Sequence, residues 1–165
     1  MEHIIRAAGA IAEVDELMIL GSQAILGTYP EAPADILVSQ EVDLYPLDDP
    51  EKADLIDGSI GELSPFHEQF GYYAHGVGPE TAILPHRWRE RLVPLRNENT
   101  HGVTGYCLSP PDLAISKLLA GRDKDLSFVS ALLRHRLVNI DQINELLDEL
   151  PEPHADRVSR ALSAL

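Results

Sequence analysis

The stretch Ser39-Gln-Glu-Val-Asp-Leu-Tyr45 places two carboxylates, Glu41 and Asp43, one residue apart in an otherwise apolar segment. In a β-strand alternate side chains point to the same face, so both carboxylates project together while Val42 and Leu44 face the other way. Two like charges held side by side repel, and a hard divalent cation such as Mg²⁺ removes that penalty by binding the carboxylate oxygens. The alternative is a half-exposed strand whose outer face is acidic. The heptapeptide alone favours that alternative, so the surrounding sequence has to decide.

Composition places the chain among globular proteins. Its 165 residues suffice for one domain, or for one domain with a small helical appendage, and 44% hydrophobic and 24% charged residues are ordinary values. No apolar run approaches the length of about 18 residues that a membrane span needs, so we expect no membrane partner. The N-terminal segment has the pattern of an amphipathic helix rather than of a signal peptide. A single cysteine, Cys107, excludes an internal disulfide and indicates a cytoplasmic protein.

The formal net charge of −14 argues against extensive nucleic-acid binding, which depends on neutralising phosphates with Lys and Arg. A net negative charge still allows a local basic site, because several of the 13 basic residues cluster in residues 87–96 and 117–136. An acidic balance fits a protein that captures cations or meets a basic partner, and solubility explains it equally well.

The first two thirds of the chain alternate between strand and helix patterns. Apolar residues at helical spacing predict a helix over 2–16, and residues 50–61 also look helical. Two prolines indicate a loop over 28–37. Short apolar or alternating runs predict strands at 17–22, 41–46, 71–77, 80–84, 91–96 and 104–108.

From Ser109 onward the patterns are helical. Ser109-Pro110-Pro111-Asp112 has the form of a helix start, with a capping hydroxyl and proline in the first turn, and that helix should end at Gly121. Further helices are expected over 124–135, 140–150 and 153–164. The prediction is an α+β fold: a mixed β-sheet flanked by helices in an α/β core, residues 1–108, and a helical C-terminal third, residues 109–165, packed on that core as a single compact unit.

A second candidate element is Gly21-Ser22, at the end of the first predicted strand. Glycine lets the backbone approach a ligand closely, and amides at a helix N-terminus bind phosphate oxygens. The serine hydroxyl adds a donor. A Gly-Ser pair on its own more often marks a tight turn.

A third candidate is the segment 116–128, in which Lys117, Arg122 and Lys124 lie close to Asp125. Mixed charges on a helix usually form solvated salt bridges, and a structural ion pair is the simplest explanation here. Lys117, however, lies among apolar residues of its helix, which is unusual for a solvated lysine.

The order of these elements resembles the nucleotidyltransferase superfamily, whose fold is that of DNA polymerase β. The likeness extends over residues 17–133 and is greatest to its toxin-like branch, which includes the toxins of type IV abortive-infection systems. The branch carries a Gly-Ser element, an S-x-D-x-D strand and a later K-x-x-A-x-x-x-R-x-K-D-like segment. This chain has Gly21-Ser22, Ser39-Gln-Glu-Val-Asp43 and Lys117-Leu-Leu-Ala-Gly-Arg-Asp-Lys-Asp125 at the matching places.

The resemblance implies a nucleotidyltransferase-like sheet and a site for a nucleoside triphosphate with Mg²⁺. By this likeness Glu41 and Asp43 are the metal ligands and belong to the catalytic group, and Gly21 and Ser22 hold nucleotide phosphates. The product would be a nucleotidylated RNA or protein hydroxyl, and the toxin-like branch implies a cognate partner protein.

The same resemblance assigns the later segment. Lys117 would act as a catalytic residue on the triphosphate or on the developing charge, and Asp125 would position Lys117 or a catalytic water. Arg122 and Lys124 would line the phosphate channel as nucleotide-binding residues.

The chain departs from the family pattern at four places. Glu41 stands where the family prefers Asp, and the interval between Ser22 and Glu41 is long. The arginine that the toxin-like branch often has shortly before the acidic strand is missing from residues 35–40, and no third acidic strand is evident. Glu80 is the nearest acidic option for a third ligand, and His75 is a poor substitute for a carboxylate. Two other interpretations therefore remain open: a catalytically degenerate binding or regulatory module with the same fold, and an acidic α+β interaction domain unrelated to nucleotides.

Overall fold

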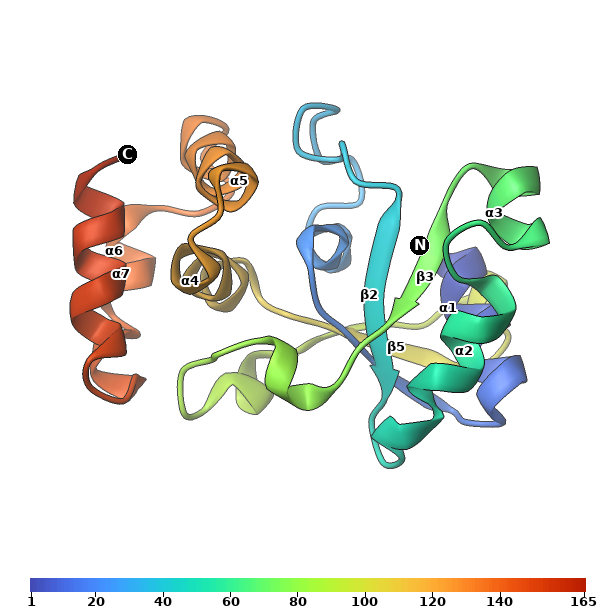
Figure 1. The fold of residues 1–165 in the computed structure, drawn as a ribbon. Helices are drawn as coiled ribbons and strands as arrows, with labels where there is room; N and C mark the ends of the chain where they lie inside the picture. Colours follow the sequence, from blue (N-terminus) through green and yellow to red (C-terminus); the bar gives the residue numbers. More distant parts are fainter.

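A five-stranded mixed β-sheet forms the centre of the computed structural model, which describes all residues 1–165 (Figure 1). The strand order is β3-β2-β1-β5-β4, in which β1 pairs antiparallel with β2 and parallel with β5, β2 pairs parallel with β3, and β4 pairs antiparallel with β5. The predicted mixed sheet is thus confirmed. The strands are β1 (Glu16–Ile19), β2 (Glu41–Pro46), β3 (Tyr73–Gly76), β4 (Val93–Leu95) and β5 (Thr104–Cys107).

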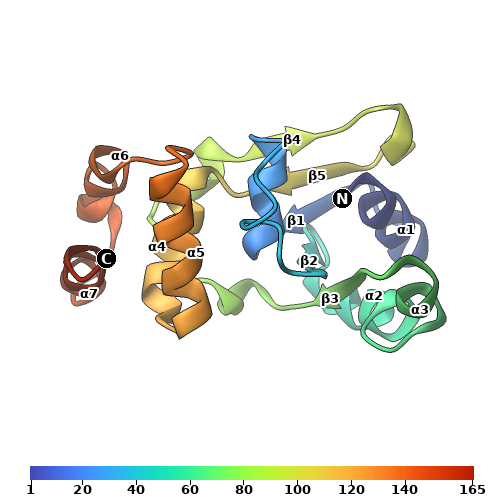
Figure 2. The same cartoon turned by 90° about the horizontal axis from the view of Figure 1, so that it is seen from above.

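Helices lie on both sides of this sheet. Figures 1 and 2 show the first three helices on one side and the last four on the other, which confirms the α+β class and the helical C-terminal third. A short 3₁₀ helix, η1 (Ser22–Gly27), packs against β2, β5 and the first helix of the C-terminal group. The α-helices are α1 (Glu2–Ala12), α2 (Ala53–Ile60), α3 (Pro65–Phe70), α4 (Pro110–Ala120), α5 (Asp123–Arg134), α6 (Ile140–Asn144) and α7 (His154–Ser163).

The start of α4 follows the sequence signal closely. The Ser109 side chain accepts a hydrogen bond from the Asp112 N–H, two prolines occupy the first turn, and Gly121 closes the helix with a φ of 69°. A left-handed residue at this position satisfies a carbonyl of the last turn, and glycine adopts that conformation without steric penalty.

Four elements differ from expectation, two in their ends and two in whether they are present. α1 ends at Ala12 instead of residue 16, because Glu13 takes a left-handed conformation that turns the chain into β1. The expected strand 80–84 is wrong: residues 79–81 form a 3₁₀ turn and the segment pairs with no strand. The expected helix 140–150 breaks after Asn144. Helix α3 was missed although Ser64-Pro65 opens it with the same capping signal as α4.

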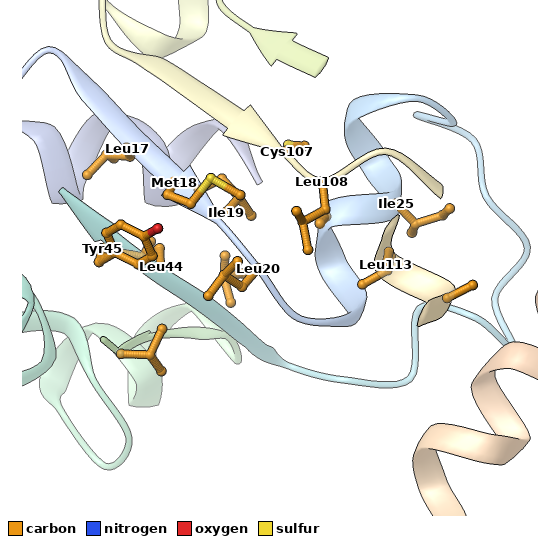
Figure 3. Close-up of a cluster of buried hydrophobic side chains, with 14 of the residues drawn as sticks. Leu17, Met18, Ile19, Leu20, Ile25, Leu44, Tyr45, Cys107, Leu108 and Leu113 are labelled. Atoms are coloured by element: carbon orange, nitrogen blue, oxygen red, sulfur yellow. The ribbon is translucent and has the colours of Figure 1, made fainter. Parts of the chain in front are cut away.

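The hydrophobic core fills the space between the sheet and its helices. Leu17, Met18 and Ile19 of β1 are fully buried, as expected for a central strand covered on both faces. Cys107 is also fully buried in β5, and burial raises the pKa of its thiol to about 12, which fits a packing role. Figure 3 labels Leu17, Met18, Ile19, Leu20, Ile25, Leu44, Tyr45, Cys107, Leu108 and Leu113 of this core.

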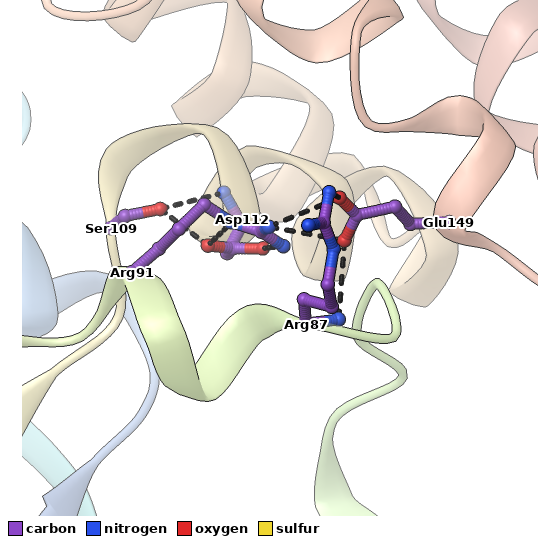
Figure 4. A network of polar contacts seen from close by, with 5 residues as sticks. All are labelled: Arg87, Arg91, Ser109, Asp112 and Glu149. Carbon is purple, nitrogen blue, oxygen red and sulfur yellow. Dashed lines mark hydrogen bonds and ion pairs between the residues drawn. The ribbon is translucent and has the colours of Figure 1, made fainter.

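A polar network connects the C-terminal helices to the preceding chain (Figure 4). Asp112 at the start of α4 is fully buried, and Arg91 forms two hydrogen bonds to its carboxylate, at 2.8 and 2.9 Å. The same guanidinium contacts Glu149 beyond α6 at 3.0 Å, and Arg87 contacts Glu149 at 2.9 Å. Ser109 also donates to Asp112. That residues 1–108 and 109–165 fold as one unit stays a prediction, and this network supports it.

None of the helices combines the length and the apolar composition that crossing a bilayer requires.

Candidate active site

The two carboxylates of β2 lie on one face of the strand. Glu41 and Asp43 are partly exposed, whereas Val42 and Leu44 between and beyond them are buried, so the alternation predicted from the heptapeptide is present. The backbone of β1 continues alongside β2, and the Leu20 N–H donates to the Asp43 carbonyl at 2.9 Å. The acidic strand therefore lies next to the Gly-Ser turn, as the sequence order predicted.

Gly21 is required by the conformation of this turn. Its φ and ψ of 60° and −178° lie in a region that residues with a side chain rarely adopt. A Cβ at this position would also collide with the Asp43 carboxylate. The absence of a side chain at Gly21 thus allows the Asp43 carboxylate to pack directly against the turn. From Gly21 the chain enters η1 at Ser22. The Gln23 side chain connects this turn to the loop just before β2 by donating to the Ser39 carbonyl at 2.7 Å.

A histidine stands where a third acid was sought. β3 pairs parallel with β2 so that His75 lies opposite Asp43, and the His75 Nδ1 is 2.8 Å from the Asp43 Oδ1. Burial acts to lower the pKa of His75, but the hydrogen bond and charge of Asp43 outweigh it, and the net effect raises that pKa. Glu80, the acidic option considered from sequence, belongs to the 3₁₀ turn after β3 and is outside this group.

Tyr73 supports the first carboxylate from the same strand. Its hydroxyl donates to the Glu41 Oε2 at 3.2 Å. Burial, together with the charge of Glu41, raises the pKa of Tyr73 to about 12, so the phenol remains a neutral donor at physiological pH.

These donors fit a divalent cation. One ligand atom each from Glu41, Asp43 and His75 lies within 4.8 Å of the others. Two carboxylates and an imidazole are common ligands of divalent ions, and neighbouring ligands of an ion bound at about 2.1 Å are about 3 Å apart. The spacing of Asp43 and His75 matches that separation.

Positive side chains come from α4, α5 and the turn between them. Lys117, in the last turn of α4, is 13% exposed and its Nζ is 3.2 Å from the Asp125 Oδ1. Arg122 donates twice to the same carboxylate, which is 1% exposed. Burial acts to raise the pKa of Asp125, but the Arg122 hydrogen bond and the Lys117 charge outweigh it and lower that pKa below its ordinary value.

The acidic and basic groups face one cavity of about 550 Å³. The Asp125 hydrogen bond and, more weakly, the charges of Asp43 and Glu41 raise the pKa of Arg122, which shows that the β2 carboxylates act electrostatically on the basic wall. Of the residues singled out from the sequence, those that line the cavity are Ser22, Glu41, Asp43, Lys117, Arg122 and Lys124. Gly21 and Asp125 lie behind the lining, the first under Asp43 and the second under Lys117.

The cavity also has an apolar part that sequence reasoning missed. Ile36 and Val38 contribute from the loop before β2, and Phe128 contributes from α5. Val38 is 78% exposed, an unusual position for a β-branched apolar residue. At the rim Arg134 pairs with Asp35 of the same loop. The only sequence feature that could have indicated this apolar part is Phe128, an apolar residue at a helical position within a charged segment.

The fold and this arrangement define the class of protein. A mixed sheet with a Gly-Ser turn, an adjacent acid-x-acid strand and a lysine-bearing helix across the cavity is the organisation of a nucleotidyltransferase. The chain belongs to the family described as "nucleotidyltransferase of unknown function (DUF6036)", whose family model matches residues 2–161. Comparisons with curated proteins and with solved structures found no match.

Proposed function

We propose that the protein binds a nucleoside triphosphate together with a divalent cation, Mg²⁺ by the resemblance, and transfers the nucleotide to a hydroxyl of RNA or of a protein. The observation that carries this proposal is the division of one cavity into two oppositely charged walls. Glu41 and Asp43 form one wall, and Lys117, Arg122 and Lys124 contribute to the other.

The two walls complement the two charge features of a metal-bound triphosphate. The Lys and Arg side chains offer donors for phosphate oxygens, and a guanidinium binds them in a bidentate manner. Ser22 at the start of η1 adds a hydroxyl close to the same space. A divalent cation held by the carboxylates would bridge them to phosphate oxygens and neutralise charge there.

The transfer step balances as a displacement at phosphorus. The acceptor oxygen forms a bond to the α-phosphorus, the bond from that phosphorus to the pyrophosphate oxygen breaks, and the hydroxyl proton passes to water. Negative charge grows on the leaving pyrophosphate, and Lys117 is the least exposed cation on the cavity wall. A poorly solvated ammonium stabilises developing charge more strongly than one in bulk water, so Lys117 is the residue that we assign to this charge.

The apolar part of the cavity suits the nucleoside. Val38 and the ring of Phe128 offer surfaces on which a planar base can pack, adjacent to the charged walls. The cavity volume of about 550 Å³ is within the range of sites that hold ligands of nucleotide size.

The proposal is tested by following label from nucleoside triphosphates into acceptors. Purified protein is incubated with total cellular RNA or a soluble protein extract, Mg²⁺ or Mn²⁺, and each triphosphate carrying ³²P at either the α or the γ position. Label from the α position should become acceptor-bound and label from the γ position should not. Asp43→Asn should abolish the transfer, and Asp54→Asn, which alters an exposed acid on α2, should leave it unchanged.

Two outcomes contradict the proposal. Transfer of the γ label would indicate a phosphotransferase. Absence of transfer with every triphosphate and acceptor, while the nucleotide still binds, would indicate the degenerate binding module.

A further inference from the structure

We propose that His75 is a third ligand of the divalent cation and that its imidazole makes the site prefer Mn²⁺ to Mg²⁺ more strongly than an all-carboxylate site would. This inference rests on the proposed function, because it concerns the cation that the proposed site would hold.

The first argument is the register of the sheet. Parallel pairing sets Glu41 opposite Tyr73 and Asp43 opposite His75, so the four side chains form two successive cross-strand pairs on two neighbouring strands. Opposed side chains in a sheet share one face, which brings the imidazole to the same side of the sheet as the acidic pair. Strand pairing thus places His75 on the face of the sheet that carries the two carboxylates.

The second argument is distance. The His75 Nδ1 and the Asp43 Oδ1 are 2.8 Å apart, close to the separation of about 3 Å expected between neighbouring ligands of one ion. The Glu41 ligand atom lies within 4.8 Å of both. Opposite ligands of a six-coordinate ion are about 4.2 Å apart when each bond is about 2.1 Å, so one ion can reach all three atoms after small rotations of the side chains.

The third argument is that no other carboxylate takes this place. Asp57 is near enough for its charge to affect His75, but its Oδ1 accepts the Gly76 N–H at 3.0 Å and is committed to the backbone. Glu80 contacts the Gly78 region after β3. The ligand group of Glu41, Asp43 and His75 therefore contains one nitrogen and carries one negative charge less than three carboxylates would.

The chemistry of the donors gives the selectivity. Mg²⁺ is a hard ion that binds oxygen and keeps several waters, whereas imidazole nitrogen suits transition ions. Mn²⁺ is a transition ion that accepts both oxygen and nitrogen ligands, so a histidine ligand should raise its affinity more than that of Mg²⁺. A simpler role for His75, as a hydrogen-bond partner that only orients Asp43, would not produce this selectivity.

The test measures metal binding without nucleotide. Mn²⁺ affinity is obtained from the electron paramagnetic resonance signal of the free ion, and Mg²⁺ affinity by competition against Mn²⁺. In the parent, pulsed resonance of bound Mn²⁺ should show coupling to a nitrogen nucleus. His75→Asp should remove that coupling and lower the ratio of Mn²⁺ to Mg²⁺ affinity about tenfold. His86→Gln, which alters an exposed histidine away from the site, should change neither quantity.

Three results overturn the inference: no nitrogen coupling in the parent, an affinity ratio that His75→Asp changes less than twofold, or no Mn²⁺ binding at millimolar concentration. Melting temperatures of the variants show whether each is folded, and His75→Gln provides a second variant if His75→Asp is not. Because nucleotide is absent, these results are separate from failure of the proposed function. Nitrogen-coupled Mn²⁺ in a protein that binds no nucleotide would refute that function alone.

Discussion

Replacing Lys117 with alanine should damage nucleotide transfer far more than it damages the fold. The Nζ of Lys117 lies on the cavity wall at 3.2 Å from Asp125. If the ammonium acts mainly on charge that develops during transfer, its loss should lower the transfer rate about a hundredfold, equivalent to about 2.7 kcal/mol of transition-state stabilisation. Nucleotide affinity should fall less, because the ground state carries less charge at the leaving group.

The effect of Lys117→Ala on stability follows from the second partner of Asp125. Arg122 donates two hydrogen bonds to that carboxylate, so Asp125 remains paired when the lysine is removed. We expect a loss of about 1 kcal/mol, the net value of an ordinary hydrogen bond, and a melting temperature lower by about 3 °C. Asp125→Ala is the contrasting variant. It leaves a lysine that is 13% exposed without its partner, and should destabilise the protein by about 3 kcal/mol.

The assay combines single-turnover transfer of α-labelled nucleotide with thermal unfolding of the same preparations. Arg160→Ala, on α7 and outside the cavity, serves as a matched loss of one positive charge. The reasoning fails if Lys117→Ala unfolds the protein while Arg160→Ala does not, since Lys117 would then be a structural partner of Asp125. It also fails if Lys117→Ala transfers nucleotide at the parental rate.

Three further predictions concern the Gly-Ser turn, the stability of the protein at low pH and the polar network around Asp112. Gly21→Ala should lower the free energy of unfolding by about 1–3 kcal/mol, because a Cβ is strained at this backbone conformation, and should weaken metal binding because it displaces Asp43. Urea unfolding and Mn²⁺ titration measure the two effects, and parental values in both would contradict the prediction. The pKa of Asp125 is lowered in the folded protein, so its contribution to stability is present above its ordinary pKa of about 3.9 and is lost as the pH falls through the folded value. Urea unfolding between pH 6 and pH 3 should show this loss of stability in the parent and a smaller loss in Asp125→Asn. An equal loss in the two proteins would refute the prediction. Asp112→Ala removes two hydrogen bonds from Arg91, which keeps Glu149 as its partner, and should cost about 2 kcal/mol. Calorimetry should still record one transition if the core and the C-terminal helices are one unit, and two separate transitions would contradict that unit.

The local part of the site could be predicted from the sequence because it depends on periodicity and turns. Strand β2 has the predicted bounds, and the side chains of Glu41 and Asp43 share a face as a period of two requires. The Gly-Ser turn follows its strand, and Ser109 caps α4 as its position before proline indicates. Such features are encoded within a few residues of each other.

The third member of the acidic group could not be predicted, because it depends on strand pairing. His75 reaches Asp43 only through the register between β2 and β3, whose residues are 32 positions apart in the chain. No local pattern distinguishes this register from a shift by one residue, which would turn His75 to the other face. That Phe128 and Val38 line one cavity depends in the same way on how α5 packs against the loop before β2.

The central claim is that Glu41 and Asp43 bind a metal-nucleotide complex, and calorimetric titration tests it most directly because it needs no knowledge of the acceptor. The α,β-methylene analogues of the four common nucleoside triphosphates, which resist transfer, are titrated with Mg²⁺ or Mn²⁺ into the parent, Asp43→Asn and Asp54→Asn. We predict binding of at least one analogue that requires the cation, is weakened at least tenfold, or about 1.4 kcal/mol, by Asp43→Asn, and is unchanged by Asp54→Asn. Equal affinity in the parent and Asp43→Asn, or no binding of any analogue by the folded parent, would contradict the claim.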